Sequence, residues 1–501
     1  MKKILYAAMS AFMLLGLFSC DLQRDPDGQD DQKNYFASLT ETKQFRDGLY
    51  SVLRGAENPE RFVWQDFQSD MFAVTTNDGN TSSRFVTWSL GHMESSDEIA
   101  SYYLAYYTLL QQANYFVGNI ERTIERGIYT TDAQVTSARM YRAEGLVMQA
   151  LALSRLMERF AYKYDPNAAA SPQNLGVVLV KGYEPFSSAP RNTQTECYQY
   201  ILDRLGEAIE VLPAKSTEGN IRISKNFALA LRSRVNLNMG NYSAAIPDAQ
   251  AVVDAYPLID ATTAAAFEKI YRSDDDNPEL VFRGYASSTI GTTVATTING
   301  AFANATYEVL FSPIAAPFQW VVDQYQASDF RKSVYISKKY YTLPGVKAYM
   351  VTKHLGNPAY RTNPNVHDFK VASRFFSVAE AYLILAESKA KTGDESGAKA
   401  VLTTLSQKRG AVLEDGAAMD LVMAERNREM IGEGSRLNDM LRWNLPNNHD
   451  DMENQPDLVD AGVAKNDKLK QAVPAGHFAF TWEIPLRDRQ VNPQILKNWP
   501  I

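Results

Sequence analysis

A helix pair in the middle of the chain constrains the fold more than any other stretch. Residues 227–239 repeat Ala and Leu at helical spacing, and Gly240 follows where a left-handed cap would end the helix. Tyr242 comes two residues later, and Ala245 and Ala249 begin the apolar face of a second helix. Small side chains let two helices approach closely while a tyrosine fills the wider turn, which is the tetratricopeptide pattern. Such pairs bury a continuous core only when several are stacked, so we expect a mainly helical scaffold.

Further segments repeat apolar side chains at three- and four-residue steps. A second pair is predicted at residues 377–392 and 398–405, with a Thr-Gly-Asp turn centred on Gly393. Other helical segments are predicted at 42–54, 102–122, 133–160 and 193–212. The pattern therefore predicts a scaffold made mainly of residues 39–57, 102–259 and 377–443.

Three long stretches between these helices lack helical periodicity. Residues 58–101, 260–376 and 444–501 are rich in Gly, Pro, Asn, Ser, Thr and aromatic residues. Irregular insertions of this length in a compact protein usually carry function, so we expect ligands and partners to meet the protein there. The predicted fold class is mainly α, with tetratricopeptide-like helix pairs as the scaffold and long irregular insertions, all within one domain over residues 39–501.

The N-terminus looks like the export signal of a bacterial lipoprotein. Two lysines precede an apolar run over residues 4–18, and Cys20 follows a small residue. This pattern is typical of a secretory signal peptide, and a cysteine directly after the cleavage site matches a lipobox in which Cys20 is lipidated. The run is too short to span a bilayer. We predict a signal peptide at 1–19 and a flexible tether at 20–38. The alternative is a plain secreted protein in which Cys20 is incidental.

Composition limits the remaining function classes. A formal net charge of −7 without a basic tract argues against nucleic acid or an anionic bilayer as partner. The hydrophobic content of 45% can supply a large core, so disorder is not expected. The chain has two cysteines. If Cys20 carries lipid, Cys197 has no partner, and we expect it to be a buried free thiol.

Motifs for metal or cofactor chemistry are weak. The five histidines are not spaced as metal ligands. The acidic stretch 274–277 lacks the alternating ligand spacing of a calcium loop, so we interpret it as a solvated turn, with a surface cation as the alternative. We predict no metal and no cofactor.

The strongest polar pattern lies late in the chain. Glu425, Glu429 and Glu433 recur every four residues and share a face if their helix is continuous. Two such carboxylates could perform the acid–base chemistry of a glycosidase. The favoured interpretation is an ion-pair network, because arginines hold carboxylates ionised. The arginines expected to form it are Arg428, Arg436 and Arg442.

Aromatic residues gather in the insertions. The first group contains Phe62, Trp64, Phe67, Phe72, Phe85 and Trp88, and the second contains Phe302, Tyr307, Phe311, Phe318, Trp320 and Tyr325. Most of them must be core residues, because aromatic side chains dominate burial. Some could form a recognition platform beside the polar stretches 77–80 and 94–98.

The chain resembles the SusD/RagB family of surface lipoproteins over essentially its whole length. The segments that carry the resemblance are 377–387 (SVAEAYLILAE), 425–429 (ERNRE), 432–436 (GEGSR), 441–443 (LRW), 484–485 (IP) and 492–493 (NP). The lipobox and the helix pairs fit the same family. Within it, the chain is most similar to the RagB branch, which takes up oligopeptides, at 68–71 (QSDM), 142–145 (RAEG), 270–274 (IYRSD), 317–323 (PFQWVVD), 488–490 (DRQ) and 498–501 (NWPI).

The resemblance implies a non-catalytic role at the cell surface. The protein would be a substrate-binding lid on a SusC/RagA-like TonB-dependent transporter, held to the outer membrane by its lipid, with two transporter–lid pairs side by side. It would capture oligopeptides. One alternative keeps this role with a glycan ligand. A surface hydrolase using Glu425 or Glu429 and a purely structural adaptor are the others.

The candidate ligand-binding residues come from two polar stretches and nearby aromatics. Peptides present backbone donors and acceptors, which amide and carboxylate side chains can bind. We expect Asn77, Asp78 and Asn80 to contact peptide backbone, and Glu94, Asp97 and Glu98 to favour cationic peptides. Trp88 and Tyr307 complete the candidate set.

Overall fold

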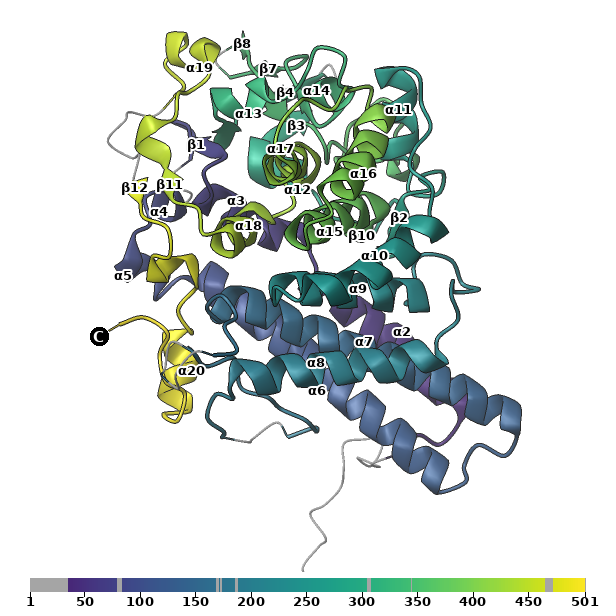
Figure 1. The fold of residues 1–501 in the computed structure, drawn as a ribbon. Helices are drawn as coiled ribbons and strands as arrows, with labels where there is room; N and C mark the ends of the chain where they lie inside the picture. Colours follow the sequence, from purple (N-terminus) through teal and green to yellow (C-terminus); the bar gives the residue numbers. More distant parts are fainter. Residues whose placement is uncertain are drawn as a thin grey trace, which may run out of the picture.

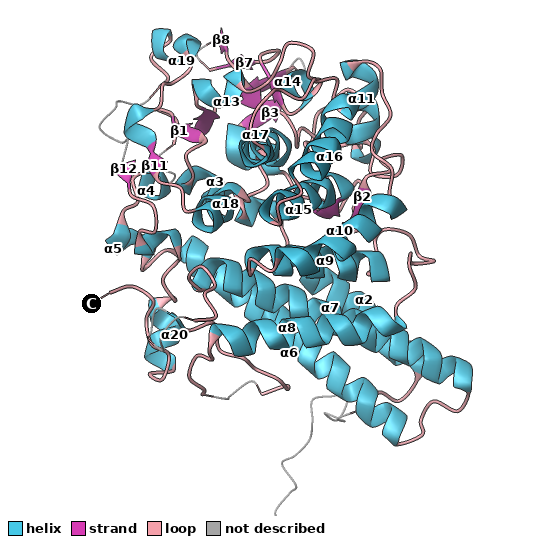
Figure 2. Cartoon of the chain, viewed as in Figure 1, coloured by secondary structure: helices cyan, strands magenta, loops and turns pink. Residues whose placement is uncertain are grey.

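A computed structural model describes most of the chain. The described residues are 35–78, 83–167, 171, 174–184, 188–303, 308–343, 345–464 and 472–500. Helices dominate throughout, and short strands lie mainly in the upper half of the molecule (Figure 2). Cys20 and most of the predicted tether fall outside the described residues. Across the part of the chain that is described, none of the helices combines the length and apolar character needed to cross a bilayer.

Long antiparallel helices build the scaffold, as the periodicity predicts. They are α2 (Leu39–Ala56), α6 (Asp97–Glu125), α7 (Asp132–Phe160), α8 (Gln194–Val211), α9 (Lys225–Asn238), α10 (Tyr242–Ala255), α15 (Val378–Lys391), α16 (Glu395–Lys408), α17 (Ala418–Met430) and α18 (Arg436–Trp443). Each of α6, α7 and α8 packs against the next, and α9, α10, α15 and α16 continue the stack (Figure 1). The mainly helical, tetratricopeptide-like fold class is confirmed.

Both predicted helix pairs form. Gly240 adopts φ 72° between α9 and α10, and Gly393 adopts φ 88° between α15 and α16. These are left-handed conformations that glycine reaches without a Cβ penalty. Ala245 and Ala249 are fully buried, which allows α10 to lie close to both α9 and α15. Tyr242 is half-buried at the turn.

Local capping explains where the longest helices begin. The side chain of Thr131 and that of Gln134 form a capping box at the start of α7, and Thr193 and Glu196 form one at the start of α8.

One turn into α8, Cys197 is a free, fully buried thiol, as expected. Burial raises its pKa to about 12, so it is not a reactive thiolate.

The insertions contain short helices and strands rather than irregular chain alone. The first holds α3 (Val63–Gln68), β1 (Phe72–Val74), α4 (Ser83–Val86) and α5 (Leu90–Met93). The second holds α11 (Ala264–Arg272), β2 (Leu280–Arg283), α12 (Val294–Asn299), β3 (Ala301–Ala303), β4 (Val309–Phe311), β5 (Ala315–Pro317), α13 (Gln319–Asp323), α14 (Arg331–Val334), β6 (Ile336–Ser337), β7 (Tyr341–Thr342), β8 (Val346–Lys347), β9 (Met350–Val351) and β10 (Arg374–Ser377). The third holds β11 (Asn447–Asn448), α19 (Pro456–Asp460), β12 (Ala472–Val473) and α20 (Leu486–Val491).

Strand pairing ties the insertions to each other. The first insertion joins the second through antiparallel β1 and β5, and the largest sheet has the order β3-β4-β7-β8. The third insertion runs along one side of the molecule, from α19 at the top of the view to α20 near the bottom (Figure 1). One hydrophobic cluster includes Phe116 of the scaffold, Phe282 of the second insertion and Trp499 near the C-terminus.

The structure differs from the sequence-based prediction at the ends of two segments and in the burial of one turn. The first insertion ends earlier than residue 101, because α6 begins at Asp97 under a Ser96 cap. The tether ends before Ser38, because Phe36 is 3% exposed and its N–H donates to Thr123 Oγ1. The turn at 274–277 is not simply solvated, since Asp274 is 1% exposed and pairs with Arg374 at 3.2 Å.

Candidate functional site

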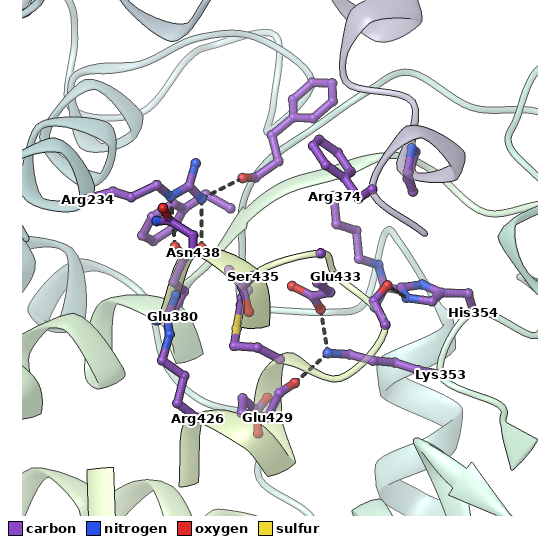
Figure 3. A pocket seen from close by; sticks show the side chains of 18 of the residues that line it. Arg234, Lys353, His354, Arg374, Glu380, Arg426, Glu429, Glu433, Ser435 and Asn438 are labelled. Atoms are coloured by element: carbon purple, nitrogen blue, oxygen red, sulfur yellow. Dashed lines mark hydrogen bonds and ion pairs between the residues drawn. The ribbon is translucent and has the colours of Figure 1, made fainter. Parts of the chain in front are cut away.

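A cavity lined in part by charged side chains lies where the scaffold meets the second insertion and the α17–α18 connection (Figure 3). Its walls include Arg234 of α9, Glu380 of α15, Lys353, Glu433 and Ser435. The volume of the cavity that is accessible to solvent is about 90 Å³. Pockets that bury a small-molecule ligand measure about 300–1,000 Å³. The cavity therefore has room for a few water molecules, not for an oligosaccharide or a peptide.

Lys353 is a buried cation on the wall of this cavity. Its Nζ lies 2.5 Å from Glu433 Oε1, donates to the backbone carbonyl of Glu429, and lies 4.5 Å from the centroid of the Tyr335 ring. Burial acts to lower the pKa of Lys353, but Glu433, Tyr271 and Glu429 together outweigh burial and the pKa is raised. Lys353 thus stays charged and holds the α17–α18 connection against the second insertion (Figure 3).

The carboxylates of α17 belong to a buried arginine network. Glu425 Oε1 lies 2.7 Å from Arg331 Nη1, and Glu429 accepts from Arg331 at 2.9 Å and from Arg409 at 3.0 Å. Burial opposes ionisation, but these arginines hold the pKa of both carboxylates below the usual range. Neither carboxyl group carries a proton to donate at neutral pH, so neither glutamate suits the role of general acid in a glycosidase.

This network confirms the structural interpretation of the late-chain motif but not all of its partners. Arg428 pairs with Glu425 at 2.6 Å, as predicted. The other two predicted arginines pair elsewhere, Arg436 with Asp70 and Arg442 with Glu387. Sequence spacing missed Arg331 and Arg409, because they reach α17 from other segments.

The three glutamates do not share one helix face. Helix α17 ends at Met430, and Gly432 and Gly434 then adopt φ 75° and 69°. These left-handed residues turn the chain, so Glu433 leaves the line of Glu425 and Glu429 and meets Lys353 instead. The expectation of a continuous helix through residue 433 is wrong.

Asp66 closes this turn from the first insertion. Its carboxyl group is 1% exposed, and both oxygens receive the Gly434 N–H, at 3.1 and 3.0 Å. Burial raises the pKa of Asp66 to about 8, and the nearby Glu433 adds to the effect. Asp66 is therefore mostly protonated at pH 7.

Asp66→Asn is expected to change how stability depends on pH. The folded-state pKa lies above the unfolded value of about 3.9, so the folded protein binds the extra proton, and stability falls as pH rises between the two values. The gap between D66N and wild-type free energy of unfolding should widen by about 1.4 kcal/mol for each pH unit from about pH 5 to 7, with D66N gaining. Urea titrations at several pH values measure this. Parallel pH profiles for the two proteins would contradict it.

The remaining titratable groups of the cavity also have structural roles. His354 Nε2 lies 3.0 Å from the Gly432 carbonyl oxygen, and burial together with Lys353 lowers the pKa of His354 to about 3. It therefore stays neutral. Among the residues that the structure describes, no group of three His, Cys, Asp or Glu side chains could hold a metal ion.

The first set of sequence-predicted ligand residues lies beyond β1. Asn77 is exposed, whereas Asp78 is 5% exposed. The chain here is held by the second and third insertions, because Thr75 donates its backbone N–H to Ile314 and Thr76 donates to Val463. Asn80 and Tyr307 lie outside the described residues.

The second set lies around the start of α6, beside the third insertion. Trp88 is 5% exposed and packs edge-on against Phe480, so its ring offers little surface to a ligand. Glu94 pairs with Arg489 of α20 at 2.6 Å. Asp97 and Glu98 form the first turn of α6, where carboxylates favour the helix dipole. The two sets are thus held by different elements.

An exposed row of side chains crosses the largest sheet. Phe302 of β3 pairs with Leu310 of β4, which pairs with Tyr341 of β7, which pairs with Lys347 of β8. Phe302 is 36% exposed, Tyr341 is 50% exposed, and Lys347 lies over the Tyr341 ring at 4.5 Å. Adjacent Leu343 is 47% exposed. We call Phe302, Leu310 and Tyr341 together the aromatic row, after the two aromatic rings on either side of Leu310.

The opposite face of the same sheet is buried, which fixes the direction of the row. Ala301, Phe311 and Thr342 are at most 3% exposed. Side chains alternate between faces along a strand, so burying these residues forces their neighbours outward. Of the predicted second aromatic group, Phe302 belongs to this row, while Phe311, Phe318 and Tyr325 are core residues. Tyr341 was missed because its strand has two residues and carries no periodic signal.

Two family models match the chain. One, described as "Starch-binding associating with outer membrane", matches residues 27–237. The other, described as "SusD family", matches residues 346–500. Among proteins with curated descriptions, none matches the chain.

Solved structures share the fold over nearly the whole chain. A SusD superfamily protein from Bacteroides thetaiotaomicron is 21% identical, with 92% of this chain and 100% of that chain covered and a TM-score of 0.73. A putative sugar binding protein from Bacteroides vulgatus is 19% identical, with 93% and 99% covered and a TM-score of 0.72. A SusD-like carbohydrate binding protein from Bacteroides vulgatus is 16% identical, with 93% and 99% covered and a TM-score of 0.72.

Proposed function

The chain belongs to the SusD family, and from this premise we propose that it is a non-catalytic glycan-binding protein of a nutrient importer. It captures oligosaccharide at the cell surface and passes it to a SusC-like transporter. The ionised, arginine-bound Glu425 and Glu429 support the absence of glycosidase chemistry.

A glycan ligand is better supported than the oligopeptide expected from the RagB-like segments. The descriptions of the matching model and of two structural neighbours name starch, sugar and carbohydrate. The similarity to the RagB branch in particular stays a prediction. An acidic, cation-selecting site is also weakened, because Glu94 is already neutralised by Arg489.

The observation that carries the proposal is the aromatic row. Flat rings exposed on a sheet can stack on the apolar C–H face of a sugar ring and bury its area without a charged partner. Phe302 and Tyr341 flank Leu310 on neighbouring strands, so their backbones are about 10 Å apart, two strand spacings.

We also propose the anchoring and assembly implied by the family. Cys20 carries the lipid that holds the protein to the outer face of the outer membrane, and the chain before Tyr35 acts as the tether. The transporter–lid unit pairs with a second copy. Labelling of Cys20 by radioactive palmitate in growing cells, lost in C20A, tests the anchor.

Removing the ring at Phe302 or Tyr341 is expected to weaken glycan binding about 10- to 100-fold, because each truncation removes about 1.4–2.8 kcal/mol of stacking. Glycans are first identified on an array of neutral oligosaccharides, and affinities of F302A and Y341A are then measured by calorimetry. Tyr183→Ala is the control, since Tyr183 is a 47% exposed tyrosine outside the row. Unchanged affinity in both row variants, or retention of peptides but no glycans, would overturn the proposal.

A further inference from the structure

A surface groove lies on the scaffold side, apart from the aromatic row. Its walls are the connection between α8 and α9 (residues 213–224), the end of α10 at Tyr256, and the segment 274–283 leading into β2. It has about 580 Å³ of accessible space, within the range of about 300–1,000 Å³ that ligand pockets occupy. Figure 1 places β2 at the right of the view, away from β7 and β8 at the top.

The polar wall of the groove is held in place before any ligand arrives. Arg283 donates Nε to Asn220 Oδ1 at 3.1 Å and Nη2 to Asp275 Oδ1 at 2.9 Å, and its backbone N–H donates to the Asn220 carbonyl at 2.9 Å. The Asp275 side chain is nevertheless 84% exposed. A fixed carboxylate with free acceptor capacity therefore faces solvent, which lowers the ordering cost of binding.

Apolar surface continues past the polar wall. A hollow of about 180 Å³ shares Ile221 and Arg222 with the groove and extends to Tyr285. The Tyr285 side chain is 50% exposed and lies beside Arg54 of α2 in the lining of this hollow. Groove and hollow together place a hydrogen-bonding wall next to an accessible aromatic ring.

Positively and negatively charged side chains are equal in number in the lining of the groove. Its ionisable lining residues are Lys215, Arg222 and Arg283 against Glu218, Asp274 and Asp275. Arg222 pairs with Glu218 at 3.1 Å and Arg283 with Asp275 at 2.9 Å. A balanced lining does not attract a strongly charged ligand over distance. Hydroxyl groups both donate and accept, so a neutral polyol suits this wall.

From these features we propose that the groove and the hollow form a second binding site for a neutral oligosaccharide, with Asp275 and Asn220 on the hydroxyl groups and Tyr285 stacked on a sugar ring. The inference takes its ligand class from the proposed function. The site would let one protein hold a long glycan at two places.

The test blocks the groove without touching the aromatic row. Ser216 lines the groove, whereas exposed Thr217 next to it does not, so S216W and T217W form a matched pair. Calorimetry uses the shortest neutral oligosaccharide retained on the array, so that one ligand molecule occupies one site. We expect two sites per wild-type chain and per T217W chain, and one per S216W chain. Tyr285→Ala should weaken the same site about tenfold, while Tyr183→Ala leaves it unchanged.

The failures of the two proposals are distinguishable. If wild type binds glycan and S216W binds it with the same stoichiometry and affinity, the groove site is overturned and the proposed function stands. If the F302A/Y341A double variant keeps one site that S216W removes, the groove is confirmed as independent of the row. If wild type retains no array glycan, the ligand class fails in both proposals. If wild type binds glycan but only peptides saturate the groove, the groove proposal fails and the proposed function stands.

Discussion

Arg331→Ala is expected to lower the free energy of unfolding by about 3–5 kcal/mol, because breaking a buried ion-pair network leaves charges without compensation. The Arg331 side chain is fully buried and contacts Asp329 at 2.8 Å as well as Glu425 and Glu429. The two glutamates keep other arginines, but the Asp329 carboxylate, which is 0% exposed, loses the one cation that pairs with it among the described residues. Urea titration measures the loss.

An exposed ion pair supplies the control for this prediction. Lys338 and Asp457 pair at 2.7 Å with side chains 41% and 38% exposed. Solvent screens such pairs, so Lys338→Ala should cost less than about 1 kcal/mol. An equal loss of unfolding free energy in R331A and K338A would contradict the prediction that burial makes the contribution of the network large.

The network also has a pH dependence opposite in sign to that of Asp66. Arg409 and Arg331 overcome the effect of burial and lower the folded-state pKa of Glu429, so its contribution to stability is present above the unfolded value of about 4.3 and is lost as pH falls further. Glu429 thus favours folding at neutral pH, where Asp66 opposes it.

Trp482→Ala is expected to cost about 4–6 kcal/mol, the loss of a large buried side chain together with an unpaired acceptor. Trp482 is 0% exposed, and its ring meets Tyr102 of α6 edge-on with the centroids 5.3 Å apart. Its Nε1–H donates to Gln68 Oε1 at 2.7 Å. The residue joins the third insertion to both the scaffold and the first insertion, so its removal leaves a cavity at their meeting point.

A second variant separates the two contributions of Trp482. Trp482→Phe keeps most of the packing but removes the hydrogen bond to Gln68, so it should cost about 1–3 kcal/mol. Urea titration of both variants gives the comparison. A loss in W482A no larger than in W482F would mean that packing at this position contributes little.

The helix pairs were predictable from sequence because their signals are local. Apolar spacing and the glycines at 240 and 393 act within a few residues of the helices that they define. The free, buried thiol at Cys197 was expected because Cys20, the other cysteine of the chain, was assigned to the lipid. These features needed no knowledge of distant chain segments.

The site was less predictable because its contacts join distant segments. Arg331 lies 94 residues before Glu425, and no spacing rule connects them. The polar insertion around Trp88 favoured an exposed aromatic side chain, but Phe480 from the far end of the chain covers it. The aromatic row depends on the register of very short strands, which sequence alone does not reveal.

Periodicity and contiguous motifs are enough to predict the helical-repeat scaffold, the approximate position of the insertions and the lipobox-like start of the chain. The arginine partners of Glu425 and Glu429, the small volume of the central cavity, and the exposure of Phe302, Tyr341 and Tyr285 follow from contacts between distant segments. Burial and ion pairing depend on which segments meet in space, and that meeting is set by packing of the whole chain.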